Sequence, residues 1–215
     1  MNTIIFSDFD GTITEQETFS LLMQEFAPDA SRAIIPKLLS GEIPLRDGVP
    51  AILETISSDR FADMQERMRL APLRPGFPEF LDLLDRYKVP LIVLSGSLED
   101  LVMARLAPFR TRVFRVIAAQ ADTSGPFLQI SSDSAGEDEL VYKPGILKEY
   151  PEARKIAIGD SVTDLAMARM ADQVFARSIL ADRLSKEGRP FTKFDTFFDI
   201  SRNIEIILKS GGRDA

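Results

Sequence analysis

The sequence contains neither cysteine nor histidine, and these two absences restrict the chemistry open to the protein. Without cysteine there is no disulfide, no thiolate metal site and no cysteine nucleophile. Without histidine the usual zinc ligands and the usual general base are missing. Acid and base chemistry near neutral pH therefore falls to carboxylates, lysine or tyrosine.

The sequence also lacks a long apolar run and a cluster of basic residues. Its apolar stretches, such as residues 91–94 and 204–208, are far shorter than the roughly 18 residues that span a bilayer. Asp8 and Asp10 interrupt the amino-terminal segment, unlike a signal peptide, so we expect a cytoplasmic protein. The net charge of −7 argues against nucleic-acid binding and favours a small-molecule partner. No pattern indicates an oligomeric state.

Short apolar segments are typical of buried β-strands, and four of them are residues 3–7, 90–94, 113–118 and 155–158. Between them, apolar residues recur at helical spacing. Strands of continuous apolar character that alternate with helices predict an α/β fold. We expect a Rossmann-like parallel sheet with helices on both faces.

Residues 15–73 break this alternation, since they contain several helical patterns and no convincing strand. We predict a small helical cap there, inserted into a core formed by residues 1–14 and 74–215. Residues 120–142 depart from the alternation a second time. Short polar and apolar alternation around a Ser-Gly-Pro turn predicts a hairpin or an extended excursion in this segment.

Polar clusters lie at or near the ends of the predicted strands, and ligands of an open parallel sheet bind beyond such ends. Asp8 and Asp10 are two positions apart, so their side chains can point the same way, and Gly11 permits a tight turn behind them. Carboxylates this close repel each other unless a cation lies between them. Asp160 offers a third carboxylate, which completes a set of the hard oxygen ligands that Mg²⁺ prefers.

The remaining clusters suit a phosphate group. Ser95 with the amides of Gly96 and Ser97 would form an anion cradle, and Lys143 would supply positive charge for phosphoryl transfer. Each cluster alone has an ordinary explanation as a turn, a helix cap or a solvated lysine. All of them in this order, at successive strand ends, favour a phosphoryl-transfer site.

FSDFDGTIT, LSGS, YKP and GDSVTD resemble, in order, the four signature motifs of the haloacid dehalogenase superfamily, over essentially the whole core. The resemblance implies that Asp8 is the nucleophile and that Asp10 is the general acid and base. It also implies that Asp160 holds Mg²⁺ together with Asp8 and the Asp10 carbonyl. The second aspartate indicates a phosphatase, because dehalogenases and ion-pumping ATPases of the superfamily lack it.

The same resemblance implies roles for the other motif residues. Ser95, Gly96 and Lys143 would bind the phosphoryl group, while Thr12 and Asp164 would support the site. A helical cap between the first two motifs is typical of the phosphoserine-phosphatase-like branch. Within that branch GDSVTDLAMARMADQVFARSIL resembles phosphatases of methionine salvage, which act on 2-hydroxy-3-keto-5-methylthiopentenyl-1-phosphate. The segment SSDSAGEDELVYKP departs from that group, which carries cysteines there.

Two alternatives remain open at this point. The first is a phosphoserine phosphatase, although that family usually has Ser-Thr where Gly11-Thr12 stands here. Its substrate would need charged partners in the cap, for which the candidates are Glu15, Glu17, Arg32 and Lys37. The second is a non-catalytic phospho-acceptor or regulatory module, against which the inserted cap argues.

The apolar residues of the cap have two interpretations. Helical spacing favours their forming the cap's own core, while sulfur and aromatic groups would also suit a pocket for a thioether-bearing substrate. The set comprises Phe19, Met23, Phe26, Met64 and Met68. We also expect the cap to open and close over the sheet edge.

Overall fold

The computed structural model describes residues 3–211, and in this range the core is a seven-stranded sheet of order β4-β3-β2-β1-β5-β6-β7. Neighbouring strands are parallel except for β4, which runs antiparallel to β3. The strands are β1 (Thr3–Ser7), β2 (Leu91–Leu98), β3 (Arg115–Asp122), β4 (Gln129–Ser131), β5 (Arg154–Gly159), β6 (Gln173–Ala176) and β7 (Thr192–Lys193).

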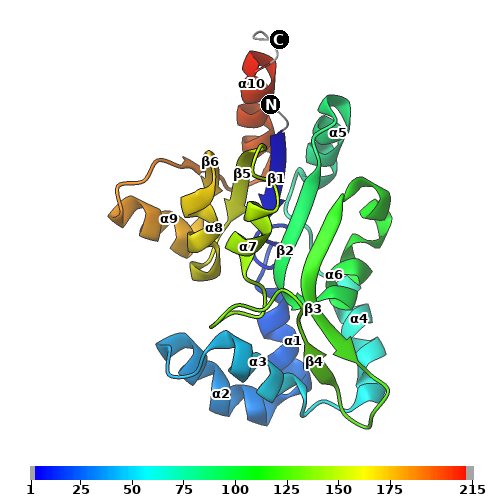
Figure 1. Cartoon of the computed structure of the whole chain (residues 1–215). Coiled ribbons are helices and arrows are strands. Elements are labelled where there is room, and N and C mark those ends of the chain that lie inside the picture. Colours follow the sequence, from blue (N-terminus) through cyan, green and yellow to red (C-terminus); the bar gives the residue numbers. More distant parts are fainter. Residues whose placement is uncertain (1–2, 212–215) are drawn as a thin grey trace.

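Helices cover both faces of this sheet (Figure 1). One face, which includes Ile5 and Val93, packs against α5, α6 and α10, and the other, which includes Phe6 and Ile92, packs against α7 and α8. The predicted α/β architecture is therefore confirmed. The core helices are α5 (Phe77–Tyr87), α6 (Glu99–Leu106), α7 (Lys143–Lys148), α8 (Leu165–Met170), α9 (Ser178–Lys186) and α10 (Phe197–Gly211).

The strand order creates a switch point next to β1. The chain passes from β1 to β2 and β3 on one side, and then crosses to β5 and β6 on the other. The carboxyl ends of β1 and β5 therefore lie side by side, where open α/β sheets bind their ligands. Asp8 follows β1 and Asp160 follows β5, so the topology itself brings these two aspartates together.

Several predicted boundaries were wrong. The third strand runs over Arg115–Asp122 rather than 113–118, and β2 continues through the Ser95 turn to Leu98, with a register shift after Leu94. Strands β6 and β7 were not predicted, because β7 has only two residues and β6 lies in a run interpreted only through its family resemblance. The hairpin in the 120–142 segment is confirmed by the antiparallel pairing of β3 with β4.

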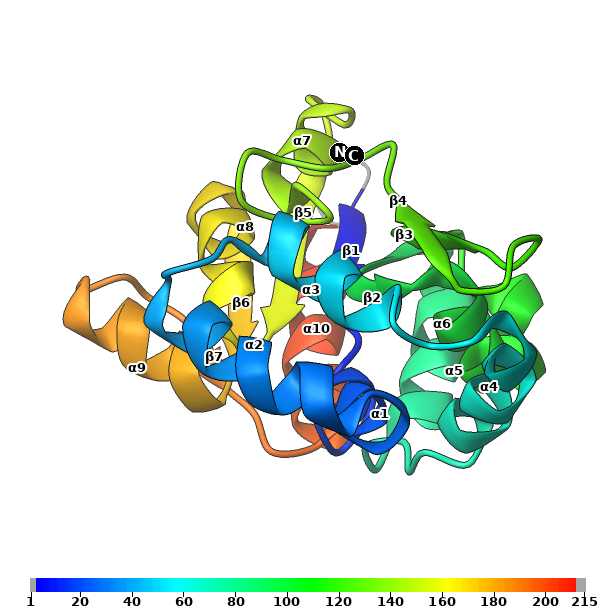
Figure 2. The same cartoon turned by 90° about the horizontal axis from the view of Figure 1, so that it is seen from below.

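The inserted segment is helical, as predicted, and it lies beyond the carboxyl ends of the strands (Figure 2). In Figure 1 α1 to α3 lie below the sheet, while α4 runs beside α6 of the core and packs on it. No helix in residues 3–211 is long and apolar enough to cross a membrane. The cap helices are α1 (Thr18–Phe26), α2 (Pro28–Ser40), α3 (Leu45–Leu53) and α4 (Phe61–Arg69), with a 3₁₀ turn at Ser58–Arg60.

The apolar residues of the cap form its interior. Met64 and Met68 are 0% exposed, and Phe19 and Met23 are buried as well. They belong to one continuous apolar cluster that also contains Leu101 of α6, so the cap and the core share an interior. The interpretation as cap core is confirmed. The alternative, a pocket for a thioether substrate, has no support from these four buried side chains, while Phe26, the fifth residue of the set, is half-buried against the Arg60 guanidinium.

Besides the hydrogen bond from the Arg46 amide of α3 to the Asp138 carbonyl at 3.0 Å, the cap is attached to the core at its linkers and at a hairpin of the core. Its two linkers pair with each other, since the Glu15 amide donates to the Pro72 carbonyl at 3.0 Å. At the opposite side the β3–β4 hairpin pairs with the segment before α4, where the Ser58 amide donates to the Pro126 carbonyl and the Leu128 amide to the Ile56 carbonyl, both at 3.1 Å. The second attachment was not foreseen from the sequence.

Candidate active site

Asp8 lies where β1 ends, and its two carboxylate oxygens have different surroundings. Its amide donates to the Ile158 carbonyl of β5 at 2.9 Å, which fixes the residue at the switch point. Oδ1 accepts a hydrogen bond from Lys143 Nζ at 2.7 Å, whereas Oδ2 is buried without a hydrogen-bond partner among residues 3–211. A buried carboxylate oxygen without a partner is unfavourable unless a ligand or cation completes it. Oδ2 is therefore the oxygen available for chemistry.

The turn after Asp10 requires glycine. Gly11 has a φ of +76°, and a Cβ there would lie 2.6 Å from Asp160 Oδ2. The close approach places Asp160 against the loop, where its Oδ1 accepts a hydrogen bond from Thr12 Oγ1 at 3.0 Å. Thr12 thus joins the loop after β1 to the end of β5.

Asp10 is held by the core and by the cap at once. Its Oδ2 accepts a hydrogen bond from Ser95 Oγ at 3.2 Å, and its Oδ1 accepts one from the Phe19 amide in the first turn of α1 at 3.0 Å. Burial raises the pKa of Asp10 to about 6, although both hydrogen bonds oppose the change. A carboxyl group with a pKa near the working pH can both give and accept a proton, as a general acid and base must.

Lys143 occupies the centre of a buried ionic network. Its Nζ contacts Asp8 Oδ1 and, at 2.6 Å, Asp164 Oδ1. Burial alone would lower the pKa of Lys143, but the charges of Asp164 and Asp8 raise it above its usual value, so the ammonium group stays charged. The other oxygen of Asp164 accepts hydrogen bonds from the amides of Asp160 and Ser161 at 2.9 and 3.0 Å. Asp164 therefore positions both the lysine and the loop after β5.

Carboxylate oxygens of Asp8, Asp160 and Asp164 lie within 4.8 Å of one another. Burial, followed by the charge of Asp164, raises the pKa of Asp160 to about 6 and the pKa of Asp8 well above its usual value. Such a cluster fits a hard divalent cation. The hydrogen bonds of Asp164 already engage both of its oxygens, so Asp8 and Asp160 are the better candidates for metal ligands.

The serine turn lies beside Asp10. Ser95 is buried, whereas Gly96 is exposed and a Cβ there would meet no atom within 4 Å. The Ser97 amide donates to Ser95 Oγ at 3.0 Å, so one of the two amides expected in the phosphate cradle is already engaged within the turn. Ser97 Oγ is buried without a hydrogen-bond partner.

Three charged residues lie near the aspartates; the sequence offered Glu17 only as a partner for phosphoserine and gave Arg74 and Arg177 no role. Glu17 is exposed as a whole residue, but its carboxyl group turns toward Asp160, and burial followed by that charge raises the pKa of Glu17 to about 8. Arg74 and Arg177 both donate to the Gly11 carbonyl, at 2.6 and 3.0 Å. Arg177 lies in the FARSIL run, which the sequence singled out without giving this residue a role.

Other cap residues do not approach the site as a phosphoserine pocket would require. Arg32 is exposed and paired with Asp29 at 3.1 Å, and Lys37 is exposed and lies 3.8 Å from Glu42. Both ion pairs are solvated surface pairs. Of the four cap residues considered as partners for phosphoserine, Glu17 is the one whose charge couples to Asp160 and Asp10.

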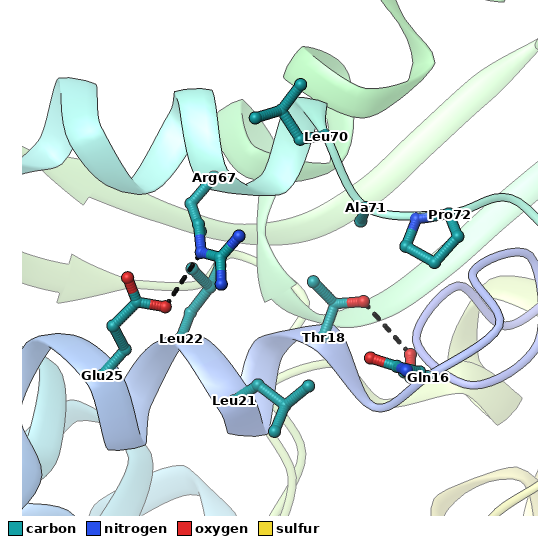
Figure 3. Close-up of a pocket in the computed structure, with 9 residues that line it drawn as sticks. All are labelled: Gln16, Thr18, Leu21, Leu22, Glu25, Arg67, Leu70, Ala71 and Pro72. Atoms are coloured by element: carbon teal, nitrogen blue, oxygen red, sulfur yellow. Dashed lines mark hydrogen bonds and ion pairs between the residues drawn. The ribbon is translucent and has the colours of Figure 1, made fainter.

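A hollow of about 110 Å³ lies between α1 and the end of α4 (Figure 3). Leu21, Leu70 and the ion pair of Glu25 with Arg67 border it, and no predicted site residue lines it. Sites for small ligands usually measure about 300 to 1,000 Å³. We therefore assign this hollow no part in substrate binding.

The comparisons with known proteins agree with this geometry. The sequence profile of haloacid dehalogenase-like hydrolases matches residues 5–169. A protein of Microcystis aeruginosa named 2-hydroxy-3-keto-5-methylthiopentenyl-1-phosphate phosphatase is 42% identical over 93% of this chain and 96% of its own length. A protein of Brevibacillus brevis with the same name is 32% identical over 95% of this chain and 96% of its own.

Solved structures of phosphoserine phosphatases share the fold. One from T. onnurineus has a TM-score of 0.71 at 20% identity, covering 95% of this chain and 94% of its own. A substrate-bound phosphoserine phosphatase has a TM-score of 0.73 at 15% identity, covering 94% of this chain and 98% of its own. The chain belongs to the haloacid dehalogenase-like hydrolase family. Within that family it is a phosphoric monoester hydrolase.

Proposed function

We propose that this phosphatase hydrolyses 2-hydroxy-3-keto-5-methylthiopentenyl-1-phosphate through an aspartyl-phosphate on Asp8, with Mg²⁺ as its cofactor. The observation that carries the chemistry is the partner-free Oδ2 of Asp8, buried beside Lys143 and Asp160. The substrate rests on the named relatives, which match nearly the whole chain, and on the GDSVTD-to-FARSIL run.

In the first step Asp8 Oδ2 attacks phosphorus, and a new oxygen–phosphorus bond forms as the bond to the leaving group breaks. Asp10 gives its proton to the departing alkoxide, for which a pKa of about 6 is suitable. Ser95, the Gly96 amide and Lys143 hold the phosphoryl oxygens. Lys143 also keeps Oδ1 of Asp8 engaged, which directs the attack to Oδ2.

In the second step Asp10, now ionised, takes a proton from water. The water oxygen forms a bond to phosphorus, the bond between phosphorus and Asp8 breaks, and inorganic phosphate leaves with the Asp8 carboxylate restored. Asp8, Asp160 and the Asp10 carbonyl would hold Mg²⁺, which supplies positive charge to the phosphoryl group. Thr12 and Asp164 keep the two loops in place.

We propose a small phosphorylated metabolite as the binding partner and the cytoplasm as the location, since a charged phosphate ester does not enter a bilayer readily. Phosphoserine is the competing substrate. Its ammonium and carboxylate groups need charged partners, and a site that leaves buried polar groups unpaired discriminates by large factors. Glu17 is one such partner, but the surface pairs of Arg32 and Lys37 provide no partner for a carboxylate at the site.

Phosphate release from both substrates under the same Mg²⁺ concentration and pH tests the assignment. We expect kcat/KM for the methylthio-keto phosphate to exceed that for phosphoserine by at least about 10². Asp8→Asn serves as the blank for contaminating phosphatases, and Asp59→Asn, on the exposed surface of the cap, is its matched control. A preference for phosphoserine would overturn the substrate while leaving the chemistry in place. No phosphate release from either substrate or from an aryl phosphate would favour the non-catalytic alternative.

A further inference from the structure

Arg74 is a buried arginine whose hydrogen bonds all go to backbone carbonyls. It lies in the linker that leads from the cap back to the core, and it is 5% exposed. Its own amide donates to the Ile13 carbonyl at 2.8 Å, so the two cap linkers are paired beside it. Its guanidinium group donates to the carbonyl oxygens of Gly11 (2.6 Å), Thr12 (2.7 Å), Thr14 (3.1 Å), Glu15 (3.3 Å) and Asp195 (3.3 Å).

Burying the guanidinium group of Arg74 without a carboxylate partner costs free energy. A buried cation usually pairs with a carboxylate, yet no ion pair of Arg74 is found within residues 3–211. Burial, followed by the charge of Arg177, lowers the pKa of Arg74. A planar guanidinium offers five N–H donors in a fixed fork, whereas a lysine ammonium offers three, so lysine cannot reproduce all of these contacts.

The carbonyls that Arg74 holds belong to the segment that fixes Asp10. Four of these carbonyls lie between Asp10 and α1, from that of Gly11, which follows Asp10 directly, to that of Glu15. The first turn of α1 then donates the Phe19 amide to Asp10 Oδ1. Residues 11–15 therefore link the backbone of Asp10 to the α1 amide that binds its side chain. Arg177 adds a second guanidinium contact, at 3.0 Å, to the Gly11 carbonyl.

We propose that Arg74 is a positioning residue for proton transfer by Asp10, because its guanidinium group fixes residues 11–15, which follow Asp10 directly and lead to the Phe19 amide that binds its side chain. The proposal rests on the phosphatase function proposed above. Arg74 does not touch the reacting atoms. Its loss changes the position of Asp10, while the contacts of Lys143 with Asp8 and Asp164, which other elements support, stay in place.

A leaving-group comparison separates this role from general structural support. Glycerol 1-phosphate releases an alkoxide that needs a proton from Asp10, whereas 4-nitrophenyl phosphate releases a stable anion that does not. In Arg74→Lys we expect the single-turnover rate of leaving-group release from glycerol 1-phosphate to fall about 10²-fold, the loss expected for a displacement of about 1 Å. The rate from 4-nitrophenyl phosphate falls by less than about tenfold, and KM for both changes little.

The same displacement slows the second step, in which Asp10 activates water. Arg74→Lys should therefore release one equivalent of nitrophenolate in a burst, followed by slow turnover. In Arg74→Ala, millimolar guanidinium should raise the rate at least about tenfold, because it fills the site that the side chain has left. Arg67→Lys, which changes an exposed arginine of the cap paired with Glu25, is the matched control and should leave both rates unchanged.

Equal losses for the two leaving groups, an unchanged rate, or an Arg74→Lys protein that is unfolded by circular dichroism would each overturn the proposal. Equal losses and unfolding would assign Arg74 to structural support alone. Failure of the proposed function is distinguishable, because in that case the wild-type protein itself would release no leaving group from either phosphate.

Discussion

The catalytic core and the cap of this protein bury different kinds of side chain. At the strand ends of the core, charged side chains are buried and cross-bonded, as in the contacts of Lys143 with Asp8 and Asp164. The cap buries apolar side chains such as Met64, and its charged residues Arg32 and Lys37 remain on the surface. What the cap gives to the site is small: the Phe19 amide on Asp10 and the carboxyl group of Glu17 beside Asp160.

The difference indicates which part of the molecule determines the chemistry and which part determines the choice of substrate. In the proposed mechanism catalysis depends on a few residues at fixed positions after strands, and short motifs identify such residues. In the same proposal substrate choice depends on which cap groups turn toward these strand ends, and the helical spacing of apolar residues does not indicate which groups do so. The cap also shares its interior with α6 and is joined to the β3–β4 hairpin, so any opening has to break the Ser58–Pro126 and Leu128–Ile56 hydrogen bonds.

Metal removal should give the largest effect, and it acts on the core alone. We expect chelation to abolish phosphate release and Mg²⁺ to restore it, because the Asp8 and Asp160 carboxylates repel each other without a cation. At a Mg²⁺ concentration of about 100 times its Kd, Tm should rise by about 5 to 10 °C. Full activity after exhaustive chelation would refute the site.

The pH dependence of that Tm gain follows from the raised pKa values of the aspartates. In the metal-free protein, Asp10 and Asp160 have folded-state pKa values of about 6, above the unfolded value of about 3.9. Their contribution to stability is present below the unfolded value and is lost as pH rises through about 6. The raised pKa of Lys143 contributes stability that is fully present below its unfolded value and is lost only as pH rises above that value, so this contribution is the same at pH 5 and pH 8. Melting curves in Mg²⁺ and in chelator should therefore differ more at pH 8 than at pH 5, and an equal difference would contradict the argument.

Asp10→Asn tests the contact between the two regions. The amide keeps the shape of Asp10 but neither protonates the leaving group nor activates water, so kcat should fall by about 10² to 10⁴. Steady-state phosphate release measures this, and melting curves show whether the hydrogen bonds to Ser95 and the Phe19 amide persist. A normal rate would remove Asp10 from its role.

Met64→Ala probes the cap alone and should have the smallest effect on activity. Truncating a fully buried methionine should lower the free energy of unfolding by about 2 to 5 kcal/mol. We expect kcat/KM for the methylthio-keto phosphate and for an aryl phosphate to change alike, because Met64 is 0% exposed and does not face substrate. Leu39→Ala, at a residue 84% exposed on α2, is the control and should change stability by less than about 0.5 kcal/mol. A selective loss for the methylthio-keto phosphate would restore the pocket interpretation.

The sequence predicted which of the candidate residues lie close together better than it predicted the contacts that support them. Asp8 and Asp160 could be paired because parallel strands end at one edge of a sheet, and the structure places them at neighbouring strands. The contacts of Arg74 with Gly11 and of Arg177 with the same carbonyl join residues 63 and 166 positions apart, and no local pattern reports such contacts. The second attachment of the cap was missed for the same reason.

Strand prediction was least accurate where strands are short or interrupted. The Ser95 turn lies within β2, because the chain resumes pairing with β3 at Leu98 after a register shift. Periodicity alone ends that strand at Leu94, where the apolar run stops. Strand β7 pairs only through Thr192 and Lys193, too few residues for any pattern.

Detection of phosphate bound covalently to Asp8 tests the central claim most directly. The protein should be mixed with a ³²P-labelled substrate, quenched in acid within milliseconds and digested. The account predicts label on the peptide that contains Asp8, stable in acid and removed by hydroxylamine, and no label in Asp8→Asn. Turnover at the full rate without any labelled protein, or with the label on another residue, would contradict it.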